Sequence, residues 1–373
     1  MKKNDIFEIE ITGITDDGDG VGRAEGMAVF VPYALMDETV RVLIVKVLKN
    51  YAVAKLMEVI KPSEARLKSE CEYFYKCGGC QFWNLDYETE LLYKKKKVED
   101  CLKRIGGIDV LVEDTKGAET VKGYRNKGQF PVSPNGAGIY QKHSHRVIDT
   151  KACLIQDKAS MEVLECVRQW MKDFNIEPYN EEVGKGVVRH IYTRSGDSGI
   201  LVCIVTNTEK IKNIDELIKM LTEKVSGISG IIQNINDKKT NVVLGKKFNT
   251  LWGDDYIIDS LGDVKFKISP RSFYQVNKKQ TEVLYSIARE FAGLTGKETV
   301  WDLYCGIGTI GQFMAKDAKK IVGIEVVPEA IENAKENAKI NNIQNAEYYC
   351  GTAEEIAPKL KGERPDVVIL DPE

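Results

Sequence analysis

One segment of the sequence limits the fold more than any other: an apolar strand that runs into a glycine-rich turn and then into a helix. The strand covers residues 300–303, and the whole segment reads TVWDLYCGIGTIGQFMAK, with glycines at Gly306, Gly308 and Gly311. Glycines permit a tight turn and let the backbone approach a ligand at the carboxyl edge of a parallel sheet. The segment therefore predicts a cofactor site in an α/β domain, and a glycine turn that holds no ligand is the less favoured interpretation.

The residues that follow continue this pattern of alternating strand and helix. The strand KIVGIE ends at Glu325, a helix (PEAIENAKENAKINN) and a strand (AEYYC) come next, and DVVILDP places Asp371 at the tip of the fourth strand. An acid at the position of Glu325 can accept hydrogen bonds from a ribose. The spacing fits a dinucleotide or S-adenosylmethionine, and the Asp371–Pro372 tip favours the second, because such a tip is typical of methyltransferases that act on bases.

The length of 373 residues suits two or three domains. Short alternating strands with frequent turns in residues 1–61 predict a small OB-like barrel. Residues 62–265 predict a mixed α+β domain, and residues 266–373 predict a parallel-sheet α/β domain with a Rossmann-like order. Within this multidomain arrangement, hydrophobic spacing predicts helices at 85–105, 159–173 and 213–224.

The charge of the chain is nearly balanced overall, at -3, but it is uneven locally. Between residues 121 and 160 we count seven Lys and Arg against two Asp. An RNA backbone could bind to this stretch, where Arg125 and Lys127 are the candidate contacts. A solvated basic surface is the alternative.

Three of the nine cysteines lie within ten residues, as Cys71, Cys77 and Cys80 in the spacing C-x5-C-x2-C. A fourth soft ligand would have to come from elsewhere, and Cys101 and Cys153 are the candidates. Four thiolates suit zinc or an iron–sulfur cluster, and the ligand type does not separate them. A chance cluster of buried thiols is the alternative.

Nothing in the sequence indicates a membrane or an export route. No apolar run approaches the ~18–20 residues that span a bilayer, and the start, MKKNDIFEIE, has no apolar core behind its lysines. We therefore expect a cytoplasmic protein with reduced thiols.

Several motifs in one order resemble the RNA uracil-5-methyltransferases. They are the cysteine motif, YRNKGQF, SPRSFYQVN, DLYCGIGTIG, GIE and a terminal LDP, behind an amino-terminal barrel. The resemblance covers essentially the whole chain and is nearest to the ribosomal RNA branch, whose members carry a TRAM barrel and a [4Fe-4S] cluster. It implies formation of 5-methyluridine in RNA, with 23S ribosomal RNA as the expected substrate.

The resemblance also assigns roles to individual residues. It implies an iron–sulfur cluster rather than zinc, with the ligands Cys71, Cys77, Cys80 and Cys153. It implies S-adenosylmethionine contacts at Gln275, Tyr304, Glu325 and Asp371, with Gly306 and Gly308 admitting the methionine part. It places RNA contacts at Tyr124, Arg125, Asn126 and Lys127, although Tyr124 could equally be a core aromatic residue.

The chemistry of this family requires two further groups. Uracil C5 is a poor nucleophile, so a cysteine thiolate first adds at C6, and a base later removes the C5 proton. Both groups follow the LDP strand in the family, whereas this chain ends at Glu373 and reads DPE where a second proline is usual. We therefore expect the first half of a methyltransferase domain, truncated and inactive as it stands. We do not nominate Cys305 as the nucleophile, since its expected role is to pack and line the pocket.

Three other functions stay open at this point. The chain could be an RNA-binding module with a degenerate or incomplete cofactor domain, or a transfer RNA uracil-5-methyltransferase. A nicotinamide oxidoreductase with an iron–sulfur centre is a third possibility, which the Asp-Pro tip and FYQVN disfavour. No protein partner is implied, and a monomer is expected.

Overall fold

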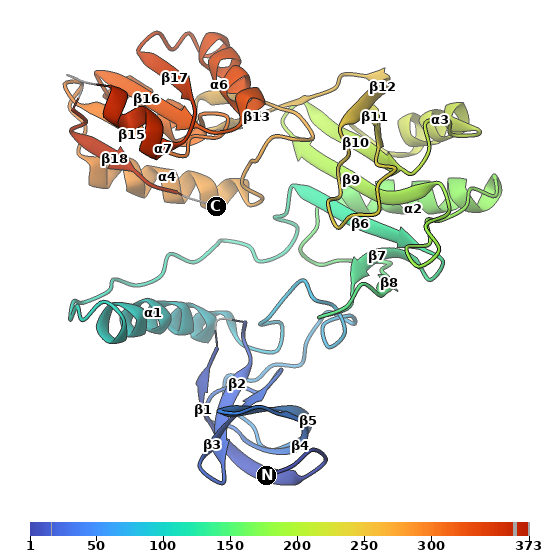
Figure 1. Ribbon diagram of the computed structural model, residues 1–373, viewed down its shortest axis with the longest axis vertical. Helices are drawn as coiled ribbons and strands as arrows, with labels where there is room; N and C mark the ends of the chain where they lie inside the picture. The colour runs from blue at the N-terminus through green and yellow to red at the C-terminus, as the bar shows by residue number, and fades with distance from the viewer. Residues whose placement is uncertain (16, 361–363, 372–373) are drawn as a thin grey trace. The chain divides into compact units, whose positions relative to one another are not determined.

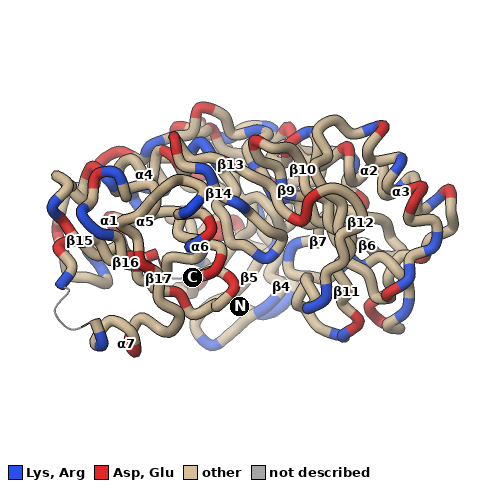
Figure 2. Tube along the Cα trace, turned by 90° about the horizontal axis from the view of Figure 1, so that it is seen from above, with Lys and Arg blue, Asp and Glu red and all other residues tan. Residues whose placement is uncertain are grey.

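The structure is a computed structural model, and it describes residues 1–373 except 16, 361–363, 372 and 373 (Figure 1). The chain forms two compact units. Unit 1 holds Met1–Glu119 and Tyr140–Arg146, and unit 2 holds Thr120–Ile139 and Val147–Glu373. Figure 2 shows Lys and Arg interspersed with Asp and Glu along the chain. In the part that the structure describes, no helix is both long enough and apolar enough to cross a membrane.

Unit 1 begins with a closed five-stranded barrel in the order β1-β2-β3-β5-β4. The strands are β1 (Ile6–Ile14), β2 (Gly20–Ala24), β3 (Met27–Val31), β4 (Thr39–Val47) and β5 (Tyr51–Lys61). Alternate residues point inward, as in β4, where Val40, Val42 and Ile44 are all fully buried. The predicted amino-terminal barrel is confirmed.

A long helix follows the barrel in unit 1. Helix α1 (Tyr87–Arg104) starts at Asp86, whose side chain accepts a hydrogen bond from the Thr89 backbone N–H at 3.0 Å. Within α1 only Tyr93 is buried, so most of the helix surface faces solvent. The helix predicted at 85–105 is present.

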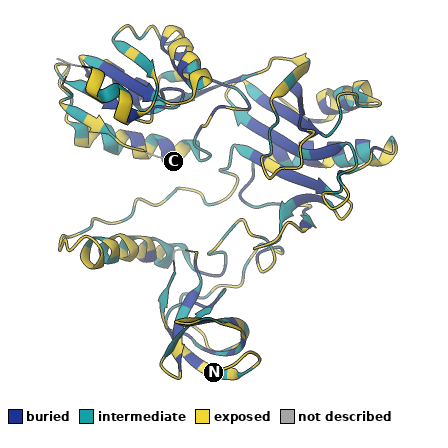
Figure 3. Ribbon diagram, in the orientation of Figure 1, coloured by how far each residue is buried: buried dark blue, intermediate teal, exposed yellow. Residues whose placement is uncertain are grey.

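Unit 2 contains a seven-stranded sheet in the order β12-β11-β10-β9-β6-β7-β8. Its strands are β6 (Lys127–Ser133), β7 (Gly136–Tyr140), β8 (Val147–Asp149), β9 (Val188–Gly196), β10 (Gly199–Thr206), β11 (Ile228–Ile235) and β12 (Lys247–Gly253). The middle strands are buried along most of their length (Figure 3).

Each face of this sheet packs against a different layer. Helices α2 (Lys158–Asp173) and α3 (Ile214–Lys224) cover one face, around the fully buried Trp170. The other face, which carries Tyr192 and Leu201, packs against the hairpin of β13 (Ile257–Leu261) and β14 (Val264–Ile268). The helices predicted at 159–173 and 213–224 are present. The boundary predicted between residues 265 and 266 falls within β14, and the division into three domains stays a prediction.

The remainder of unit 2 is a four-stranded parallel sheet in the order β17-β16-β15-β18. Its strands are β15 (Thr299–Asp302), β16 (Lys320–Glu325), β17 (Ala346–Cys350) and β18 (Val367–Ile369). Its helices are α4 (Lys278–Ala292), α5 (Thr309–Met314), α6 (Pro328–Ile340) and α7 (Ala353–Ile356), with short 3-10 turns at Ala315–Asp317 and Ala357–Lys359. This confirms the predicted alternation of strand and helix.

Candidate cofactor and RNA site

Two acids end neighbouring strands at the carboxyl edge of the parallel sheet. Asp302 is the last residue of β15 and Glu325 is the last residue of β16, and the two strands pair in parallel register. The glycine-rich turn leaves β15 at this edge and enters α5 at Gly308. The two acids and the turn therefore meet where α/β sheets bind their ligands.

The turn needs glycine because of its backbone conformation and its close neighbours. Gly306 and Gly308 have φ values of 54° and 83°, in the left-handed region. A Cβ at Gly308 would lie 2.7 Å from Gln312 Nε2 and 3.0 Å from the hydroxyl of Tyr348. A larger residue at this position would displace both side chains.

The Glu325 carboxylate is held by the backbone around it. Its Oε2 accepts a hydrogen bond from the Gly306 N–H at 3.1 Å, and its Oε1 accepts one from the Val327 N–H at 2.9 Å. A carboxylate has about four lone-pair sites, so each oxygen can accept a further donor. This arrangement fits the two hydroxyls of a ribose.

Asp302 is a member of the site that sequence reasoning missed. It is 1% exposed, its Oδ2 accepts the Gly311 N–H at 3.1 Å, and its Oδ1 has no hydrogen-bond donor among the described residues. Burial raises the pKa of Asp302 to about 7, and the charges of Asp371 and Glu325 add to the effect. A buried oxygen without a donor is a place where a ligand donor would fit. The signal available in the sequence was an acid directly before the glycine turn.

Cys305 lies inside the turn and is buried. Its backbone N–H donates to the Ile324 carbonyl at 3.0 Å, and its thiol donates to the Gly306 carbonyl at 3.7 Å. Burial, followed by the charges of Asp302 and Glu325, raises the pKa of the Cys305 thiol. A thiol in this state is a poor nucleophile, because the thiolate is the reactive form.

Tyr304 and Asp371 lie at the same sheet edge. Tyr304 lies two residues after the end of β15 and is 40% exposed. Asp371 follows β18, which pairs with β15 through Ile369 and Asp302, and it is exposed. Residues 372 and 373 of the Asp-Pro-Glu end lie outside the described residues.

Gln275 belongs to the connection between β14 and α4, which we call the cofactor segment (residues 269–277). Asn126 lies against it: its backbone N–H donates to the Val276 carbonyl at 2.9 Å, and its side-chain amide donates to the Gln275 carbonyl at 3.2 Å. The side chain of Gln275 itself has no hydrogen-bond partner among the residues that the structure describes. The structure therefore joins the YRNK motif to the motif that carries Gln275, a link that the sequence analysis did not foresee.

The other candidate RNA contacts lie beside Asn126. The Arg125 Nε donates to the Lys127 carbonyl at 3.1 Å, and the Lys127 ammonium lies 5.5 Å from the centre of the Tyr192 ring. Both side chains are half-buried. Their contact with RNA stays a prediction.

The cysteine candidates are divided between the two units. Cys71, Cys77 and Cys80 belong to unit 1 and Cys153 to unit 2, all half-buried and none in a disulfide. The Gly79 N–H donates to the Cys77 sulfur at 3.3 Å. Across the described ranges, no group of three or more His, Cys, Asp or Glu has the geometry of a metal site. The donor chemistry of four thiolates suits an iron–sulfur cluster, and the cluster stays a prediction.

The segment Tyr140–Arg146 contacts the backbone of the cysteine motif (residues 71–80) within unit 1. The Gly78 N–H donates to the Tyr140 carbonyl at 3.1 Å, and the Lys142 N–H donates to the Lys76 carbonyl at 3.0 Å. The Lys142 ammonium also pairs with Asp19 of the barrel at 3.1 Å. Lys142 and Arg146 of the predicted basic stretch therefore belong to unit 1.

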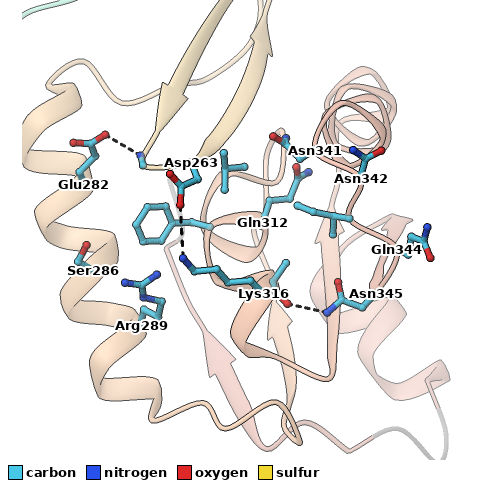
Figure 4. A pocket seen from close by; sticks show the side chains of 15 residues that line it. Asp263, Glu282, Ser286, Arg289, Gln312, Lys316, Asn341, Asn342, Gln344 and Asn345 are labelled. Atoms are coloured by element: carbon cyan, nitrogen blue, oxygen red, sulfur yellow. Dashed lines mark hydrogen bonds and ion pairs between the residues drawn. The ribbon is translucent and has the colours of Figure 1, made fainter.

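Unit 2 contains a cavity of about 560 Å³, and Figure 4 shows the side chains that line it. It lies between α4, α5 and the connection from α6 to β17, and its lining includes Glu282, Gln312 and Asn345. None of the predicted cofactor residues lines it. The cavity is therefore separate from the sheet edge that carries the acids and the glycine turn.

Comparison with known proteins gives consistent findings. The chain matches the TRAM domain family over residues 2–57 and a methyltransferase domain family over residues 294–372. An uncharacterized RNA methyltransferase of Clostridium acetobutylicum is 48% identical over 383 residues, which cover 100% of this chain and 83% of that protein. A second, from Clostridium tetani, is 45% identical over 380 residues with the same coverage.

A solved structure is also similar. It is the crystal structure of Pyrococcus abyssi tRNA (uracil-54, C5)-methyltransferase in complex with S-adenosyl-L-homocysteine. The TM-score is 0.77 and the sequence identity 26%, over 98% of this chain and 83% of the other.

Proposed function

We propose that this chain, which belongs to the RNA uracil-5-methyltransferase family, transfers a methyl group from S-adenosylmethionine to C5 of a uridine in RNA. The observation that carries the proposal is the Glu325 carboxylate, held by two backbone N–H groups beside the glycine turn at the sheet edge. The cofactor supplies an electrophilic methyl group when it is bound.

Residues at the sheet edge and in the cofactor segment are proposed to bind different parts of this cofactor. Glu325 accepts hydrogen bonds from the ribose hydroxyls, and the turn at Gly306 and Gly308 leaves room for the methionine part. Gln275, Tyr304 and Asp371 are proposed as the remaining contacts. Two observations support this assignment: the Gln275 amide has no hydrogen-bond partner among the described residues, and the ring of Tyr304 is exposed.

The uridine has to leave its stack, because C5 and C6 are attacked from above and below the ring. Arg125 and Lys127 are proposed to hold the RNA backbone near the cofactor segment, which Asn126 contacts directly. The methyl transfer needs a thiolate at C6, and the chain has buried thiols at Cys166, Cys203 and Cys305. Burial raises the pKa of all three, so none of them is proposed as the nucleophile.

We propose that Cys71, Cys77, Cys80 and Cys153 hold a [4Fe-4S] cluster. The support is their thiolate chemistry and the Gly79 N–H directed at the Cys77 sulfur, a contact that tunes such clusters. The methyl transfer involves no electron, so the cluster would be structural or would position the RNA.

Ribosomal RNA is the substrate that we favour, on the resemblance of the barrel and the cysteine motif. Transfer RNA is the second candidate, because the similar solved structure is a transfer RNA enzyme. An RNA-binding module without transfer activity is the third.

The test is methyl transfer from labelled S-adenosylmethionine to unmodified ribosomal and transfer RNA, followed by nucleoside analysis. Label in 5-methyluridine of ribosomal RNA supports the first substrate, and label confined to transfer RNA supports the second. The variant Glu325→Gln tests the proposed ribose contact and should weaken binding of S-adenosylhomocysteine. A chain that binds RNA but not S-adenosylhomocysteine is the binding module, and the proposed function is then wrong.

A further inference from the structure

Arg194 is a buried cation in the middle of unit 2. It lies on β9, is 0% exposed, and donates its hydrogen bonds to carbonyl and hydroxyl oxygens rather than to a carboxylate. Burying an unpaired charge is costly unless every donor is hydrogen-bonded. The hydrogen-bond partners of Arg194 therefore indicate its role.

Its partners are carbonyls of the cofactor segment. The guanidinium donates to the Ser272 carbonyl at 2.9 Å and to the Tyr274 carbonyl at 3.5 Å. It also donates to the hydroxyl of Tyr192 at 2.9 Å, and that hydroxyl donates to the Pro270 carbonyl at 3.1 Å. Alternate carbonyls of the segment are thus held from one face of β9.

The cofactor segment needs such donors because it belongs to no strand or helix. Ser272 and Tyr274 are buried, and buried carbonyls are nearly always hydrogen-bonded. The Asn126 contacts hold the next two carbonyls, those of Gln275 and Val276. The backbone of Gln275 is therefore fixed on both sides, while its side chain has no partner among the described residues.

We propose that Arg194 is a positioning residue, which shapes the cofactor segment so that Gln275 can contact S-adenosylmethionine. This inference rests on the proposed function. Arg194 acts through the segment's backbone and does not itself touch the cofactor.

The same strand offers a matched control. Arg189 also lies on β9, is 5% exposed, and also donates to carbonyls, those of Asn236 at 2.6 Å and Lys238 at 2.7 Å. These carbonyls belong to a different connection, between β11 and β12. Replacing either arginine removes a buried cation and its hydrogen bonds to carbonyls. Of the two, only Arg194 donates to carbonyls of the cofactor segment.

The experiment measures the Kd of S-adenosylhomocysteine by calorimetry for the full chain and its Arg194→Met, Arg194→Lys and Arg189→Met variants. Circular dichroism first establishes a temperature at which each variant is folded. Arg194→Met should weaken binding about tenfold or more, as expected for a lost charge-assisted hydrogen bond. Arg194→Lys should recover part of this loss, and Arg189→Met should bind as the unchanged chain does.

Tyr192→Phe is the second variant, for the case that Arg194→Met does not fold. It removes only the hydroxyl that relays Arg194 to Pro270, and it should weaken binding in the same direction. Equal Kd values for the unchanged chain and for every folded variant of Arg194 and Tyr192 would overturn the inference. Equal weakening by Arg189→Met and Arg194→Met would also overturn it, since both effects would then be general destabilisation. A failure of the unchanged chain to bind S-adenosylhomocysteine would refute the proposed function instead.

Discussion

Replacing Asp302 with Asn should make the stability of unit 2 less dependent on pH. The folded chain raises the pKa of this buried carboxyl from its ordinary 3.8 to about 7. Between these two values the folded state retains a proton that the unfolded state has released. The stability that Asp302 contributes is therefore greatest at low pH and is lost as the pH rises towards 7.

The magnitude follows from the size of the shift. Each unit of pKa corresponds to about 1.4 kcal/mol, so the loss between pH 5 and pH 8 is about 3 kcal/mol. For a unit of this size, about 2 to 4 °C of Tm corresponds to each kcal/mol. The Tm of the unchanged chain should thus fall by about 6 to 12 °C more than that of Asp302→Asn between pH 5 and pH 8.

The assay is thermal unfolding followed by circular dichroism at several pH values. Asn preserves the volume of the side chain and the oxygen that accepts the Gly311 N–H, so the variant lacks only the titration. The buried His190, whose pKa is lowered to about 4 by burial and then by Arg189, opposes the effect, but it is common to both proteins and cancels in the comparison. Asp263→Asn, at a side chain that is 97% exposed, is the control and should follow the unchanged chain. Parallel Tm curves for Asp302→Asn and the unchanged chain would refute the reasoning.

Three further changes test other parts of the structure. Gly308→Ala should weaken S-adenosylhomocysteine binding at least about tenfold, because the new Cβ would lie 2.7 Å from Gln312 Nε2. Calorimetry measures the Kd, and an unchanged Kd would contradict this prediction. Cys80→Ser should lower the iron content of the anaerobically purified protein, whereas Cys101→Ser, on the exposed surface of α1, should not; equal iron in both would argue against the proposed ligands. Asn337→Ala should lower stability by about 1 to 3 kcal/mol in denaturant unfolding, since the Asn337 amide joins the Lys267 N–H to the Ile307 carbonyl, and a change below about 0.5 kcal/mol would contradict that role.

The parts of the site that sequence reasoning found are those with local signals. The glycine turn could be predicted because its signals are adjacent in the sequence. An apolar strand is followed at once by glycines, which readily adopt the positive φ found at Gly306 and Gly308. The barrel could be predicted because burial alternates along each strand, as in β4. Glu325 could be predicted because a strand end precedes a helix there.

The parts that were missed depend on distant contacts. The carbonyls that Arg194 and Tyr192 hold lie 78 to 80 positions further along the chain, so nothing near Arg194 marks its role. The raised pKa of Asp302 depends on burial that only the folded sheet provides. The contact between the Asn126 amide and the Gln275 carbonyl joins residues 149 positions apart, so the sequence did not show it, and contact of Asn126 with RNA stays a prediction.

The path of the chain between the two units has a consequence for how the protein is made. Unit 1 takes its last piece, Tyr140–Arg146, from beyond a stretch that belongs to unit 2, so the chain passes between the units at 119–120, 139–140 and 146–147. The amino-terminal part therefore cannot reach its final form on the ribosome until Arg146 has been synthesised, although domains generally fold in order from the N-terminus. A protease cut at any one of these crossings leaves the units joined by the other two. A gene fragment that stops at residue 119 yields a barrel and helix whose Asp19 has lost Lys142.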